Sequence, residues 1–126
     1  MSWGSSQEEW GAEFKARACN MLDLYSRTLS DLGYDARAYA DTAARLGETS
    51  RFSGKYDALC HAMWMCGEAK KFVSHGREAK AYRWIGMIQG LLWAHGVFSI
   101  EELKTHNELD EEFWARWDRR QGPRRD

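Results

Sequence analysis

The sequence predicts an all-α domain, and three features of its 126 residues lead to that class. The only proline is Pro123, so no upstream residue breaks a helix through the loss of a backbone N–H. Eleven glycines are spread along the chain and can end helices in the left-handed conformation. Apolar residues recur at steps of three and four, and no segment alternates for long enough to predict a strand. The length corresponds to a single domain, 1–126.

The N-terminal part predicts one long helix and one short helix. Ser6 and Glu9 have the spacing of a capping box, and the apolar positions after them follow a helical period. Gly33 is suited to end this first helix. A second helix is expected over 35–46, where a thin, alanine-rich face is followed by another glycine, Gly47.

The middle of the chain predicts an antiparallel helical hairpin. Apolar residues at helical spacing indicate one helix over about 55–75 and another over about 77–95, with Gly76 between them. A break this short makes consecutive helices run in opposite directions. Gly96 is expected to end the second of the two helices. We expect the rest of the domain to be built around this hairpin.

The C-terminal part predicts one or two short helices. Ser99 and Glu102 form a second capping box, which is expected to start a helix that runs to about His106. A last helix would hold Trp114 and Trp117. From about residue 119 the chain is rich in arginine and is expected to form a flexible tail. The total is five or six helices.

Charge and composition exclude several classes of protein. The 18 basic and 19 acidic residues leave a net charge of −1, so the chain as a whole is not a polycation. The first residues lack the basic and apolar regions of a secretion signal. The longest run without charge, 84–100, is short and interrupted for a membrane span. We therefore expect a protein of the cytosol that does not enter a membrane.

Sequence motifs for chemistry are absent, so we expect no catalytic residue, no metal and no cofactor. Cys60 and Cys66 lie six residues apart, which is about 240° around a helix, and there is no C-x-x-C or H-x-x-x-H element. With Cys19 they make an odd number of cysteines without a secretion signal, which favours reduced thiols. Their role stays open.

The helix over 77–95 is apolar on nearly every side from Trp84 onward. The side opposite its main apolar stripe carries Gly86, Gly90 and Trp93, and the G-x-x-x-G spacing lets another backbone approach closely. Two interpretations remain open. This side is buried among the other helices of the same domain, or it packs against a second subunit in a homodimer.

The hairpin turn carries a cluster of basic residues near a helix N-terminus, where free N–H groups also favour anions. The candidate anion-binding residues are Lys70, Lys71, Arg77, Lys80 and Arg83. They are suited to a phosphate, a nucleic-acid backbone or an acidic protein surface. The alternative is a solvated turn that pairs with the acidic segment 101–112.

Seven tryptophans exceed what a small core needs. Aromatic residues are enriched among the residues that dominate binding at protein interfaces. The candidates that the predicted core stripes do not explain are Trp64, Trp93, Trp114 and Trp117. We interpret these four as anchors for a partner. The alternative is that they stack on nucleic-acid bases while the basic turn contacts phosphates.

Residues 55–107 resemble a group of short uncharacterised proteins encoded by tailed phages and prophages. The resemblance is carried by CHAMWM in the first hairpin helix, by GREAKAYRWIGMIQGLLW in the second and by SIEELKTHN after it. It implies the cytosol of a bacterial host, and it implies binding to a host enzyme or to a defence system such as a CRISPR complex. The leading hypothesis is thus a non-enzymatic protein that binds and inhibits a host or defence protein. The alternative is a nucleotide or nucleic-acid binding protein.

Overall fold

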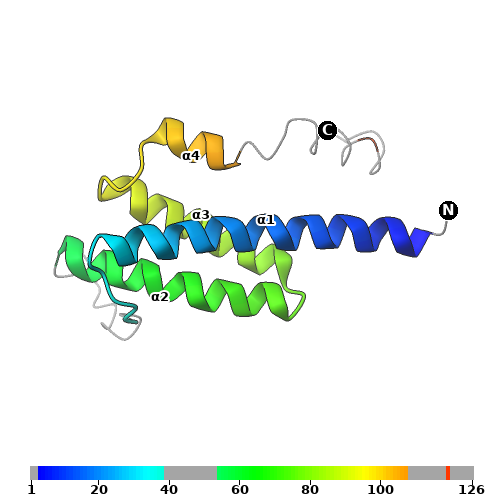
Figure 1. Ribbon diagram of the computed structural model, residues 1–126, viewed down its shortest axis with the longest axis horizontal. Helices are drawn as coiled ribbons and strands as arrows, with labels where there is room; N and C mark the ends of the chain where they lie inside the picture. The colour runs from blue at the N-terminus through cyan, green and yellow to red at the C-terminus, as the bar shows by residue number, and fades with distance from the viewer. Residues whose placement is uncertain (1–2, 39–53, 108–118, 120–126) are drawn as a thin grey trace, which may run out of the picture.

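A computed structural model of the chain describes residues 3–38, 54–107 and 119, with side chains from residue 11 onward. These ranges contain four helices and no strand (Figure 1). The helices are α1 (Trp3–Asp31), α2 (Lys55–Ser74), α3 (Glu78–Ala94) and α4 (Ile100–Asn107). The predicted all-α class is confirmed.

The three long helices lie side by side, and α4 packs on α3 at one end of the bundle (Figure 1). α2 and α3 form the predicted antiparallel hairpin, against which α1 packs. The core lies between these helices, because each contributes a stripe of apolar residues at steps of three and four. Its largest fully buried side chains include Leu22, Tyr25, Leu29, Leu59, Met65, Ile88 and Leu92.

Three helices end in the same way, at the glycines that the sequence marks. Gly33, Gly76 and Gly96 have positive φ angles of 94°, 73° and 74°. The residue after each glycine donates its backbone N–H to the carbonyl five residues earlier, at 3.0, 2.8 and 2.8 Å: Tyr34 to Leu29, Arg77 to Phe72 and Val97 to Leu92. These are Schellman motifs, which satisfy carbonyls that a helix end otherwise leaves open. Gly47 lies outside the described residues.

The start of α4 also follows the prediction. Glu102 donates its backbone N–H to Ser99 Oγ at 3.1 Å, and Ser99 donates its own to Glu102 Oε1 at 3.0 Å. These reciprocal bonds complete the capping box. The bonds from Ser99, its backbone N–H first, hold the pKa of the Glu102 carboxyl below its ordinary value.

The start of the first helix and the expected second helix require corrections. α1 begins at Trp3, so Ser6 and Glu9 lie within the helix and do not start it. Residues 35–38 are not helical, and the rest of the expected helix, 39–46, lies outside the described residues. Arg37 instead donates its backbone N–H to the carbonyl of Cys60 at 3.1 Å. An alanine-rich face buries little apolar area, so docking against α2 decides the backbone path here.

The number of helices also differs from the prediction. Four helices are described, against the five or six expected. The last expected helix, with Trp114 and Trp117, falls on residues outside the described ranges, as does most of the tail from 119.

Candidate functional site

A row of partly exposed aromatic rings crosses from α2 to α3 in the hairpin. His61 and Trp64 stack at 5.3 Å between ring centroids, and Trp64 lies 6.1 Å from Trp84. Trp84 meets Phe72 edge to face at 4.9 Å. All four rings are half-buried, and Trp64, Phe72 and Trp84 pack against the core. The row therefore joins α2 and α3 into one continuous aromatic surface.

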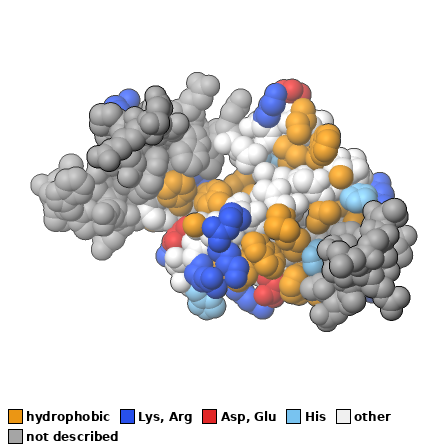
Figure 2. Space-filling view, turned by 180° about the vertical axis from the view of Figure 1, so that it is seen from behind, with side chains coloured by type: hydrophobic (Ala, Val, Ile, Leu, Met, Phe, Trp, Pro, Cys, Tyr) orange, Lys and Arg blue, Asp and Glu red, His pale blue; other side chains and the backbone are white. Residues whose placement is uncertain are grey.

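Two cations extend this row toward the hairpin turn. Lys80 Nζ lies 4.5 Å from the centroid of the Phe72 ring, and Arg77 Cζ lies 5.7 Å from it. The Schellman bond from Arg77 to Phe72 brings the guanidinium back over the ring. Such contacts contribute about 0.5–1 kcal/mol at exposed sites and hold the charges in place. We call His61, Trp64, Phe72, Arg77, Lys80 and Trp84 the hairpin face. In the space-filling view, lysine and arginine side chains gather beside hydrophobic ones (Figure 2).

The other predicted anion-binding residues have different surroundings. Lys70 pairs with Asp23 of α1, and Lys71 pairs with Glu68 at 2.9 Å. Arg83 is exposed. The structure thus brings Arg77 and Lys80 together on Phe72, whereas Lys70 and Lys71 form ion pairs with carboxylates of the same chain.

The acidic segment 101–112 was the expected counterpart of the basic turn. Of its described members, Glu101 pairs with Lys104 of the same helix at 3.5 Å, and Glu102 caps α4. The carboxylates that pair with lysines before the turn are instead Asp23, with Lys70, and Glu68, with Lys71. Glu108 and the acidic residues after it lie outside the described ranges.

The outer side of α3 is not covered by any described residue. Gly86 and Gly90 are exposed, and a Cβ added to either would meet no atom within 4 Å. Trp93 is 55% exposed and Met87 is 61% exposed. Burial of this side within the domain is therefore not observed for the described residues. Of the other tryptophans singled out, Trp64 belongs to the hairpin face, and the remaining two are outside the described ranges.

A buried polar network joins α1, α3 and α4. Gln89 donates to Tyr25 Oη at 2.8 Å and exchanges two hydrogen bonds with Asn107, at 3.0 and 3.1 Å. Tyr25 Oη lies 3.0 Å from His106 Nδ1, and burial raises the pKa of this phenol. Because Tyr25 accepts from Gln89, its own hydrogen is free for His106. The sequence offered one signal for this network, a lone glutamine on the apolar side of α3.

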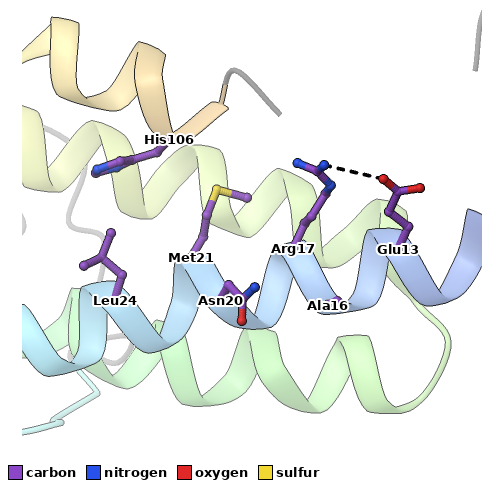
Figure 3. A pocket seen from close by; sticks show the side chains of 7 residues that line it. All are labelled: Glu13, Ala16, Arg17, Asn20, Met21, Leu24 and His106. Carbon is purple, nitrogen blue, oxygen red and sulfur yellow. Dashed lines mark hydrogen bonds and ion pairs between the residues drawn. The ribbon is translucent and has the colours of Figure 1, made fainter. Parts of the chain in front are cut away.

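An open hollow lies beside this network, between α1 and α4 (Figure 3). Its volume is about 490 Å³, and its walls are Glu13, Ala16, Arg17, Asn20, Met21, Leu24 and His106. Arg17 pairs with Glu13 at 3.4 Å along one edge, and His106 stands at the other end. Arg17 and Glu13 neutralise each other's charge, so the hollow does not favour a charged ligand.

The described part of the chain holds no cluster of three histidine, cysteine, aspartate or glutamate side chains able to bind a metal ion. Cys60 and Cys66 are buried, and burial raises the pKa of the Cys66 thiol to about 11. A thiol in such surroundings is a poor nucleophile. Burial also lowers the pKa of His61, which favours the neutral form of the stacked imidazole.

Comparison of the chain with protein-family models, with curated proteins and with solved structures finds no match in any of the three. The resemblance of residues 55–107 to phage-encoded proteins therefore stays a prediction. None of the described helices combines the length and apolar character that crossing a bilayer requires.

Proposed function

We propose that this chain is a non-enzymatic binding protein whose hairpin face engages an acidic surface of a protein partner. One observation carries the proposal: four adjoining aromatic rings end in two cations that are held on Phe72. Aromatic residues and arginine are the types most enriched where binding energy concentrates at interfaces.

The hairpin face is also prepared for binding by its own packing. The rings of Trp64, Trp84 and Phe72 pack on the core, so they lose little rotamer freedom when a partner covers them. Lys80 and Arg77 lie on a ring and are similarly restrained. Because Lys70 and Lys71 pair with carboxylates of this chain, the positive charge that the hairpin face offers to a partner comes from Arg77 and Lys80. An acidic partner complements this charge.

The biological setting of the proposal comes from the resemblance of residues 55–107. A phage-encoded binding protein would act in the bacterial cytosol on a host or defence protein, for example a CRISPR complex. Inhibition would follow if the hairpin face covered an acidic surface that the partner needs for its own contacts.

The proposal is tested by capturing partners from a bacterial lysate that has been treated with nuclease. We expect one specific protein to be retained by the wild-type chain and lost with Lys80→Glu, which reverses a charge on the row, and with Trp64→Ala. The matched control is Lys15→Glu, which reverses an exposed charge on α1. The proposal would be contradicted if Lys15→Glu lost the captured protein as fully as Lys80→Glu does, or if Lys80→Glu still retained it.

A second candidate function, binding of single-stranded nucleic acid, is favoured by the same juxtaposition of half-exposed rings and cations. Bases stack on aromatic rings with about 1–3 kcal/mol each, and lysine and arginine contact phosphates. This candidate predicts that a fluorescent oligonucleotide binds the chain and is released by salt. It also predicts that nuclease removes whatever the lysate experiment captures. Retention of the same protein after nuclease treatment would exclude it.

A further inference from the structure

We infer that a second copy of this chain packs antiparallel on the outer side of α3 and that Arg83 of each copy lies over Trp93 of the other. We call Arg83, Gly86, Gly90 and Trp93 the α3 outer face. At 100° per residue these four lie within an arc of about 80°, so they share one side of the helix. All four are exposed. This inference does not depend on the proposed function of the hairpin face.

The α3 outer face has a palindromic arrangement. Positions 83 and 93, and positions 86 and 90, are each symmetric about position 88. When two identical helices cross antiparallel about a twofold axis at that position, Gly86 of one copy opposes Gly90 of the other. Arg83 then opposes the second copy's Trp93. A twofold interface requires a surface that is complementary to itself, and this sequence order supplies one.

The contacts that this arrangement creates are favourable. Among the described residues the two glycines leave open space above α3, because a Cβ at either position would meet none of their atoms within 4 Å. The two helix backbones can therefore approach closely. Trp93 is 55% exposed and offers the aromatic face on which a guanidinium binds best. Because of the twofold symmetry, the dimer holds two equivalent Arg83–Trp93 contacts.

A second copy fits this face better than an unrelated partner does. Its charged group is the cation Arg83, and its exposed aromatic group is Trp93. One copy thus presents both halves of the pair in the order that the other copy needs. A single pair of helices buries less than the about 1,600 Å² of a standard interface, so the dimer is expected to be weak.

Sedimentation equilibrium tests the inference. The average mass of the wild-type chain should rise from monomer toward dimer between about 1 and 100 µM. Gly90→Leu should keep the chain monomeric, because the new side chain holds the two backbones apart. The matched control is Gly67→Leu, at an exposed glycine in the middle of α2 that also has open space around it. Gly67→Leu should dimerise as the wild type does. A wild type that is monomeric throughout would overturn the inference.

The antiparallel register has its own test, which uses disulfide formation between copies. A Gly86→Cys variant mixed with a Gly90→Cys variant should cross-link faster than either variant alone. The antiparallel arrangement places 86 opposite 90, whereas a parallel one places each position opposite itself. The variants should fold, because helical φ angles and open space accommodate both substitutions. Faster cross-linking within the unmixed variants would refute the register.

Discussion

Replacement of Gln89 by leucine tests whether the buried polar network fastens α4 to the long helices. Leucine has a similar size but removes four hydrogen bonds: one to Tyr25 at 2.8 Å, two with Asn107 at 3.0 and 3.1 Å, and a long one to the weak acceptor Met21 Sδ at 3.9 Å, which contributes little. The bond to the fully buried Tyr25 contributes about 1 kcal/mol. Each bond to Asn107 contributes about 0.5 kcal/mol, because the exposed Asn107 side chain can turn to water.

These losses add to about 2 kcal/mol, and burying a more apolar side chain offsets about 0.5 kcal/mol. We therefore expect Gln89→Leu to lower the free energy of unfolding by about 1.5 kcal/mol, measured in urea with an unchanged m-value. Amide hydrogen exchange should locate the effect. A loss of this size speeds exchange about tenfold in α4, which depends on the network, and speeds it less in α2.

The matched control for this change is Asn20→Leu, which removes an exposed amide from α1. It should change the free energy of unfolding by less than about 0.5 kcal/mol. A Gln89→Leu chain as stable as the control, with α4 exchanging at the wild-type rate, would show that the network does not hold α4. In that case α4 would be held by its apolar contacts alone, with Leu103 as the main one.

Three further outcomes follow from the structure. Ser99→Ala removes the cap of α4 and should lower the free energy of unfolding by about 1 kcal/mol in urea; an unchanged midpoint would show that the cap contributes nothing. With a thiol reagent at pH 8, the partly exposed Cys19 should react in the folded chain, while Cys66, with a pKa of about 11, reacts only after unfolding. Burial raises the pKa of Tyr82 to about 12. The unfolded state ionises this phenol near its ordinary pKa of about 10, so stability falls as the pH rises from 10 to 12, and Tyr82→Phe should lessen that fall.

The features that the sequence predicted correctly are local ones. A Schellman motif needs a glycine at the end of a helical pattern, and a capping box needs two residues three positions apart. Gly33, Gly76 and Gly96 and the Ser99–Glu102 pair could therefore be identified without tertiary contacts. The path of residues 35–38 could not, since their backbone is directed by Cys60 on another element.

The candidate site was predictable in part for the same reason. Single residues such as Trp64 and Lys80 stand out by type, but the aromatic row depends on how the two hairpin helices are aligned. A signal for that alignment existed, because Phe72 and Lys80 lie four residues before and after Gly76. The partners of Gln89 come from α1 and α4, and no local pattern in the sequence connects them.

The short turn at Gly76 has a consequence for the order of folding. α2 and α3 are neighbours in sequence and in space, so their contacts close a short loop and form early. α1 precedes them, and α2 is the helix that covers most of its apolar stripe. About 43 residues separate the end of α1 from the end of α2, which takes roughly 2 to 9 s of synthesis at 5–20 residues per second. During that interval the apolar stripe of α1 lacks the helix that covers it in the folded chain.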